Sequence, residues 1–184
     1  VGQGDGAVIR TPAGRWIVVD AGPRTDRYDA GRRVVAPFLA RRGARRLSVV
    51  VVSHAHLDHL GGVTSLLRRY PAELVLDPAA PVADPAYTGL LDALAASGTA
   101  WRPARAGMAF EIDGVRFSVV HPDTTWHEWG DDVNEDSIVL RVEYGGFSAL
   151  FTGDAGIPAE ARLAGRIGRV DLLKVGHHGS RGAT

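Results

Sequence analysis

A short segment of the chain concentrates side chains that can bind metal ions. Residues 53 to 59 read Ser-His-Ala-His-Leu-Asp-His, which places four potential ligands, His54, His56, Asp58 and His59, within six residues. Side chains two apart on an extended segment point the same way, so His54 and His56 can face one ion. Asp58 and His59 lie on the turn that follows and can face a second. An alternative is an ordinary helix start that Asp58 caps, in which the three histidines have no role. Because the chain has only seven histidines in 184 residues, their clustering favours a site for two metal ions.

Two later segments carry the same kinds of side chain. Phe151-Thr-Gly-Asp154 and Gly176-His-His-Gly-Ser180 each follow a predicted strand, as the first cluster does. Taken alone, Asp154 is typical of a turn, and the histidine pair of a surface loop. Beside the first cluster, Asp154 can supply a bridging carboxylate, while His177 and His178 become candidate ligands between which the sequence does not decide.

Short β-branched runs alternate with amphipathic stretches along the chain. The predicted strands are residues 7–10, 15–20, 47–53, 73–76, 115–121, 137–144, 147–152 and 170–175. The predicted helices are residues 31–42, 61–70, 85–96 and 158–167. Turns at residues 12–14 and 145–146 predict two hairpins.

These elements indicate an α/β fold. Residues 49–52 are apolar on both faces, as in a sheet that is covered on each side, whereas residues 115–152 predict an antiparallel meander. We therefore expect mixed sheets layered with helices in one domain over residues 1–184. The start at Val1 and the stop at Thr184, each beside a glycine turn, suggest a fragment of a longer chain truncated at both ends.

The composition excludes several functional classes. The chain is 45% hydrophobic, carries 21 basic and 21 acidic residues and contains no cysteine. It therefore has no disulfide partners and no thiolate ligands, so any metal is held by His and carboxylates. No apolar run is long enough for a membrane span. The zero net charge gives no global attraction to nucleic acid, so such binding must be local.

The spacing His54-x-His56-x-Asp58-His59, followed by Gly61-Gly62 and later by Thr152-Gly153-Asp154, resembles the metallo-β-lactamase superfamily. This resemblance implies a four-layer αβ/βα sandwich with a dinuclear site along one edge.

Further segments are similar to the hydrolase domain of ComEC-type DNA-uptake proteins. They are Val1-Gly-Gln-Gly-Asp5, Val19-Asp20-Ala-Gly22, residues 134–140 and residues 173–180. Many of those proteins have Asp at the second ligand position, where this chain has His56, as in the wider superfamily.

The resemblance implies a ligand set for two divalent ions, Zn or Mn. His54 and His56 bind the first ion, Asp58, His59 and either His177 or His178 bind the second, and Asp154 bridges them, so that Asp58 and Asp154 are the catalytic carboxylates. A third ligand of the first ion stays open, because His121 and His127 are more typical of a strand end and a loop. The remaining candidates lie around the ligands or face the substrate: Asp5, Asp20, Asn134, Lys174 and Ser180.

Two metal ions can orient a water for attack and stabilise charge on the attacked oxygen, which predicts hydrolysis. The ComEC-like segments imply a bacterial nuclease that cuts one DNA strand during uptake. They also imply that this is a soluble domain of an inner-membrane protein, partnered by DNA and by the channel region of the same chain. Without that resemblance a cytoplasmic location is expected.

Two alternatives remain open at this point. One is an ester or amide hydrolase of lactonase or lactamase type, and the other is a module that guides DNA without cutting it. Four arginines between residues 41 and 46 and the tryptophans at 126 and 129 are compatible with DNA binding. Each is more typical of a solvated helix end or a pinned loop.

Overall fold

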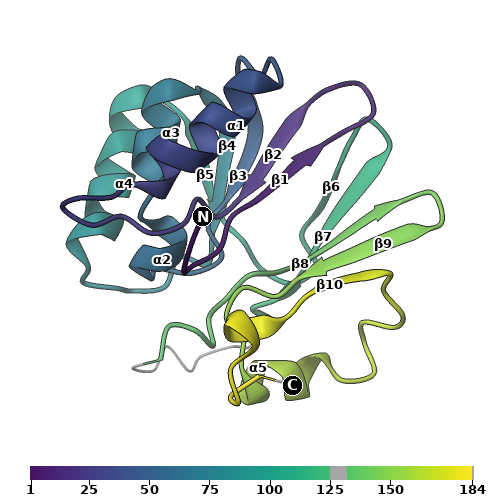
Figure 1. Ribbon diagram of the computed structural model, residues 1–184. Helices are drawn as coiled ribbons and strands as arrows, with labels where there is room; N and C mark the ends of the chain where they lie inside the picture. The colour runs from purple at the N-terminus through teal and green to yellow at the C-terminus, as the bar shows by residue number, and fades with distance from the viewer. Residues whose placement is uncertain (125–131, 184) are drawn as a thin grey trace.

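The structure is a computed structural model that describes residues 1–124 and 132–183. Its strands form two five-stranded sheets (Figure 1). The first sheet has the order β1 (Ala7–Arg10), β2 (Trp16–Val19), β3 (Leu47–Val51), β4 (Ala72–Asp77) and β5 (Ala100–Pro103). The second has the order β10 (Leu172–Lys174), β9 (Phe147–Phe151), β8 (Val139–Tyr144), β7 (Val115–His121) and β6 (Ala109–Ile112).

Both sheets are mixed. The hairpin β1–β2 is antiparallel, while β2, β3, β4 and β5 run parallel to one another. In the second sheet β6 to β9 form an antiparallel meander, and β10 is parallel to β9. The predicted hairpins and the predicted meander are confirmed.

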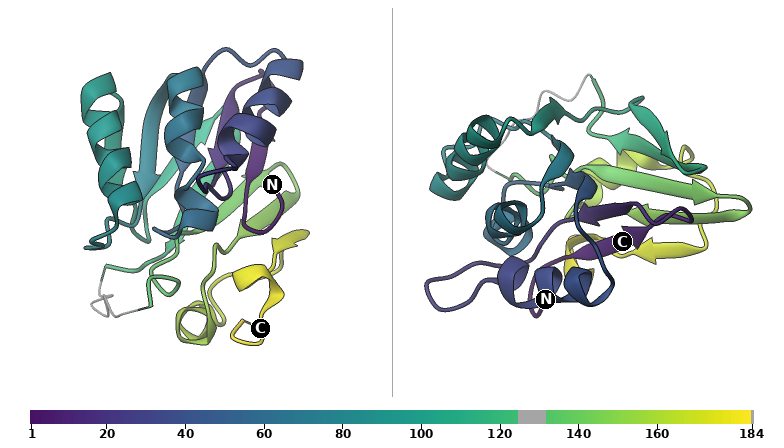
Figure 2. Two further views of the ribbon diagram at one scale, coloured as in Figure 1. Left: turned by 60° about the vertical axis from the view of Figure 1, so that its left-hand side comes forward. Right: turned by 90° about the horizontal axis from the view of Figure 1, so that it is seen from above.

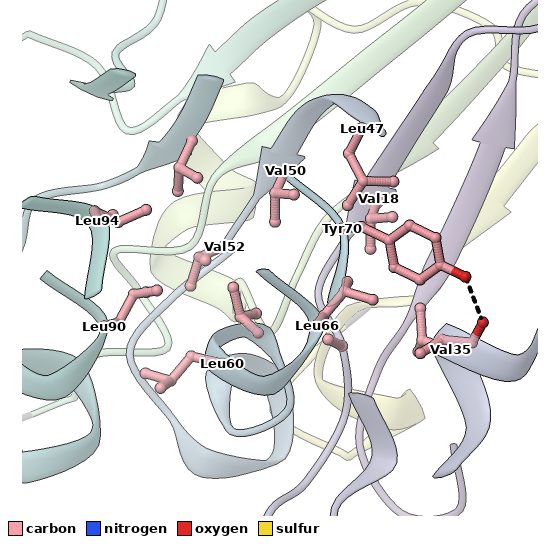
Figure 3. Packing of buried hydrophobic residues seen from close by; sticks show 14 of the residues in the cluster. Val18, Val35, Leu47, Val50, Val52, Leu60, Leu66, Tyr70, Leu90 and Leu94 are labelled. Carbon is pink, nitrogen blue, oxygen red and sulfur yellow. Dashed lines mark hydrogen bonds between the residues drawn. The ribbon is translucent and has the colours of Figure 1, made fainter. Parts of the chain in front are cut away.

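Alternating side chains of the central strands supply two separate cores. In β3, Val50 packs with the helices, whereas Val49 and Val51 pack with the second sheet. The helical side of the first sheet is covered by η1 (Gly31–Val35), α1 (Ala36–Arg41), α3 (Val63–Arg69) and α4 (Pro85–Ser97), as Figure 2 shows. Figure 3 shows this core, in which the buried Tyr70 hydroxyl donates to the Ala36 carbonyl over 3.1 Å.

A third core completes the layers. The outer face of the second sheet, including Val139 and Leu150, packs against Ala159 and Leu163 of α5 (Ile157–Leu163). Helices, sheet, sheet and helix therefore follow one another, which confirms the predicted four-layer sandwich. Burial of apolar surface at three interfaces is the main stabilising contribution to such a fold.

The predicted elements needed three corrections. Strands β5 and β6 were missed, because every residue of β5 is exposed and its sequence shows no alternation. The predicted helix over residues 61–70 is α3, and it is preceded by a separate turn of helix, α2 (Leu57–Leu60). The expected turn at Asp58 and His59 is therefore helical. The last predicted helix is shorter and ends at Leu163.

Within the described residues, no helix combines the length and the apolar character that crossing a bilayer requires.

The interface between the two sheets is expected to dominate stability. Phe117 is fully buried there, and its ring stacks on Phe110 with centroids 5.0 Å apart. Phe117→Ala should lower the free energy of unfolding by about 3–5 kcal/mol through lost burial and the cavity left behind. Phe147→Ala is the matched control, because Phe147 is half exposed and its loss should cost less than about 1 kcal/mol. Equal losses in urea denaturation would contradict this account of the core.

Candidate metal centre

Four side chains from separate segments meet at one edge of the sheets. Asp5, His59, Asp154 and His178 each place one potential ligand atom within 4.8 Å of the others. They follow the start of the chain, β3, β9 and β10 respectively. The carboxyl ends of parallel strands lie at one edge of a sheet, and this brings distant segments together. His59 of α2 and His178 of η2 (Gly176–Gly179) have ring centroids 5.3 Å apart.

His59 is fixed from both sides of its ring. Its side chain is fully buried, and Nδ1 lies 2.9 Å from Oδ2 of Asp20. Nε2 lies 3.2 Å from Oδ1 of Asp154. A carboxylate on one ring nitrogen sets the tautomer and the orientation of a histidine, leaving the other nitrogen for a ligand.

Asp20 also holds the loop that follows β3. Its Oδ1 accepts from the Ser53 backbone N–H over 2.7 Å, and its Oδ2 accepts from the Ser53 hydroxyl over 2.7 Å. The Ser53 hydroxyl oxygen further lies 3.0 Å from Nδ1 of His54. Asp20, which is 1% exposed and has a φ of 57°, thus ties the ends of β2 and β3 to two histidines.

Asp154 is placed by the turn after β9. Its backbone N–H donates to Ser137 Oγ over 3.0 Å. Gly153 has a φ of 55°, and a Cβ there would lie 2.9 Å from the side chains of Ser137 and Ser53, so the turn requires glycine. Lys174 Nζ donates to the Gly153 carbonyl over 2.6 Å, lies 3.5 Å from Asp154 Oδ1, and also pairs with Asp5.

The structure distinguishes the two adjacent histidines. His178 Nε2 lies 3.2 Å from Asp154 Oδ2 and 3.3 Å from Asp58 Oδ2, and its Nδ1 lies 3.3 Å from Asp5 Oδ1. His177 stands outside the four-residue cluster, with its ring centroid 6.1 Å from that of His178. Both residues have positive φ angles of 44° and 53°, a turn that presents the second ring to the centre.

His54 and His56 form a pair beside this cluster. His54 Nε2 lies 3.2 Å from His56 Nδ1, and the rings of His54 and His59 are 4.2 Å apart. His54 is fully buried, whereas His56 is exposed. The two ring nitrogens therefore face a common point, but no third His, Asp or Glu of the described residues groups with them.

The other candidate residues lie further out. Asn134 Oδ1 is buried without a hydrogen-bond partner among the described residues, and the Ser180 backbone N–H donates to the His177 carbonyl over 2.8 Å. His121 Nε2 contacts the Glu135 carbonyl at 2.8 Å. The tryptophans at 126 and 129 and the histidine at 127 fall outside the described residues. The arginines of residues 41–46 precede β3, so the length of that five-residue strand, about 17 Å at 3.3 Å per residue, separates them from the cluster.

Burial and charge oppose one another at the centre. Burial lowers the pKa of His59, but its contacts with Asp154 and Asp20 prevail and raise that pKa to about 10. Burial raises the pKa of Asp154, yet the contact with His59 and the nearby positive charges bring it well below its usual range. Burial, together with the charge of His59, lowers the pKa of His54. The carboxylates around His59 thus make the centre a site that favours a positive charge.

The donor set fits a divalent metal ion. His59 Nε2 and Asp5 Oδ2 are buried, and neither makes a hydrogen bond of ordinary geometry within the described residues. Two imidazoles and two carboxylates without sulfur suit ions such as zinc or manganese. The structure therefore supports a metal-binding cluster at Asp5, His59, Asp154 and His178.

The comparisons with known proteins agree with this geometry. The family model described as "Beta-lactamase superfamily domain" matches residues 15–178. The chain belongs to the metallo-β-lactamase superfamily. Its fold is similar to that of a Cronobacter sakazakii metallo-β-lactamase with a HARLDQ motif, with a TM-score of 0.60. The two sequences are 17% identical, and the match covers 91% of this chain and 69% of the other.

Two longer relatives match almost the whole chain. ComE operon protein 3 of Bacillus subtilis is 29% identical over 100% of this chain and 25% of its own length. Competence protein ComA of Neisseria gonorrhoeae is 31% identical over 97% of this chain and 23% of its own length. The chain thus spans about a quarter of the length of these relatives. The chain is a metallo-β-lactamase superfamily hydrolase with bacterial competence-protein relatives.

Sequence reasoning placed two residues less centrally than the structure does. Asp5 was predicted among the residues that lie around the ligands or face the substrate, whereas its carboxylate is one of the four in the cluster. Its position depends on a hydrogen bond from the Asp5 backbone N–H to the Asp58 carbonyl at 3.1 Å. This contact joins residues that are distant in sequence, so no local sequence pattern predicts it. Ser53 was noted only as the first residue of the histidine-rich segment. Its contact with Asp20 could have been predicted, because Ser53 and Asp20 follow the ends of two parallel strands.

Asp20→Asn tests how far the network around His59 prepares the centre. The substitution keeps the size of the side chain but removes the charge that orients His59, so affinity for zinc or manganese should fall about 10–100-fold. The exposed Asp92 supplies the matched control, Asp92→Asn, which should bind metal like the wild type in calorimetric titrations. Equal affinities for all three proteins would count against the network.

Metal binding should also release protons. Because the pKa of His59 is raised to about 10, its imidazole holds an extra proton at pH 7, and a metal ion must displace it. Titrations in buffers of different ionisation enthalpy should report release of about one proton from this residue, with affinity rising as pH rises. His59→Gln should abolish that release. Binding without proton release at pH 7 would contradict the displacement of a proton from His59 by the metal.

Proposed function

We propose that this domain is a metal-dependent phosphodiesterase that cuts one strand of DNA during uptake. The observation that carries the proposal is the convergence of Asp5, His59, Asp154 and His178 from four separate segments. The choice of DNA rests on the competence relative, which matches 97% of this chain.

Residues of four segments would hold the metal. Asp5, His59, Asp154 and His178 form one ligand set, with Asp58 beside His178, and the facing nitrogens of His54 and His56 would hold a second ion next to it. Divalent ions in such a site activate water at neutral pH and stabilise charge on the attacked phosphate oxygens. Zinc and manganese both suit these nitrogen and oxygen ligands.

The protein's own groups position the reaction. The Asp58 carboxylate is one third exposed and faces the cluster through His178, so it can orient an attacking water and accept its proton. The Lys174 ammonium, which is 22% exposed and next to Asp5 and Asp154, adds a fixed positive charge near the phosphate. Preorganised charges of this kind stabilise the transition state without reorganisation.

We propose further that the domain works as a soluble part of a larger inner-membrane protein, beside the channel region of the same chain. This proposal is supported by the relatives, of which the chain covers about a quarter. DNA delivered by the channel would be the natural substrate.

The direct test is cleavage of end-labelled single-stranded and duplex DNA with added zinc or manganese. The wild type should cut in a metal-dependent manner. Asp154→Asn should reduce the rate at least about 100-fold, since loss of even an outer partner of a ligand costs up to that much. Asp92→Asn should cut normally. Metal binding without DNA cleavage, together with hydrolysis of lactones or lactams, would refute the proposal.

A further inference from the structure

An arginine-rich groove lies on the helical face, apart from the metal centre. It encloses a cavity of about 980 Å³ between η1–α1 and α3, and the segment 24–29 closes one end. Six arginines line it: Arg24, Arg27, Arg32, Arg33, Arg68 and Arg69. All six are exposed. On a chain of zero net charge, this is a strong local excess of positive charge.

Two carboxylates, Asp26 and Asp29, also line the groove, so that six arginines less two aspartates leave four positive charges uncompensated. Asp29 is engaged in structure, since its Oδ1 accepts from the Arg32 backbone N–H over 2.8 Å and from Ser65 Oγ over 2.7 Å. Its other oxygen lies 3.9 Å from Arg24 Nε. Within residues 1–124 and 132–183, the other five groove arginines form no ion pair with Asp or Glu. Guanidinium groups gathered in this way repel one another, and a polyanion relieves that repulsion.

The elements that form the two walls of the groove meet at a close backbone contact. Gly31 of η1 lies directly on the backbone of Gly62, before α3, where a Cβ on either residue would overlap the other's backbone. The arginines of both walls are therefore carried on elements that are in direct contact.

Two contacts join the groove to the metal centre. The Arg24 backbone nitrogen lies against Gly61, the residue that follows α2 with its Asp58 and His59. The Tyr28 hydroxyl donates to the Val1 carbonyl over 3.5 Å, at the start of the segment that carries Asp5. A strand that lies in the groove would thus run toward the edge where the cluster sits.

We propose that this groove binds the sugar–phosphate backbone of single-stranded DNA and guides it to the metal centre, an inference that rests on the proposed function. Guanidinium groups match phosphate oxygens in a bidentate manner. A membrane surface with acidic lipids is the other polyanion to consider. Stable membrane attachment adds burial of apolar side chains to the attraction of basic ones, and of the large exposed apolar residues only Val34 belongs to η1, while none lies on α1 or α3.

The experiment measures binding of a fluorescent 20-nucleotide single strand to the 184-residue chain in EDTA, where cleavage cannot interfere. Arg32→Gln/Arg33→Gln should weaken binding roughly tenfold near 100 mM salt and should reduce the salt slope by about 1.4, because each lost phosphate contact removes about 0.7. The matched control is Arg102→Gln/Arg116→Gln, which removes equal charge at exposed arginines outside the groove and should bind like the wild type. Unfolding temperatures should match in all three proteins.

Three outcomes would overturn the groove proposal. In the first, the wild type does not bind DNA. In the second, both double variants weaken DNA binding equally. In the third, the groove variant binds DNA as the wild type does but no longer binds phosphatidylserine vesicles. DNA cleavage is measured separately with added metal and tests the proposed function. Binding of DNA in the groove without cleavage would support the groove proposal and contradict the proposed nuclease function.

Discussion

The buried carboxylate of Asp20 is the constraint on which the candidate centre depends. An ionised carboxylate that is 1% exposed is strongly unfavourable unless its oxygens are satisfied. The backbone N–H and hydroxyl of Ser53, together with Nδ1 of His59, provide that satisfaction at 2.7 to 2.9 Å. The same three contacts join the end of β2 to the end of β3 and turn His59 Nε2 toward Asp154. The contacts that stabilise the buried carboxylate of Asp20 therefore also hold the His59 ring in the orientation that a ligand needs.

The layered fold supplies the second part of this arrangement. The strands before Asp20, Ser53, Asp154 and His178 all end at one edge, and their apolar faces are locked by three separate cores. The residues that bear ligands sit on the short turns beyond those ends, where the backbone adopts positive φ at Asp20, Gly153 and His178. The rigid strands and the turns at their ends hold the carboxylates of the centre so close that they repel one another. A bound cation offsets this repulsion.

Much of this could be predicted from the sequence. The central strands are buried on both faces, so their runs of valine are easily recognised, and the candidate ligands of residues 54–59 are close in sequence, of which His59 belongs to the cluster. The failures share one physical cause, which is dependence on non-local contacts. β5 is exposed throughout and exists because it pairs with β4. Asp5 reaches the cluster through a backbone hydrogen bond to Asp58, and His178 is selected over His177 by the turn of η2.

Anomalous diffraction from crystals grown with zinc or manganese tests the central claim most directly. The account predicts a strong peak at ligand distance, about 2.0–2.2 Å, from His59 Nε2 and from carboxylate oxygens of Asp5 or Asp154, with His178 completing the set. A peak held by other residues, or none at this edge in a protein saturated with metal, would contradict the assignment of these four side chains as a metal centre.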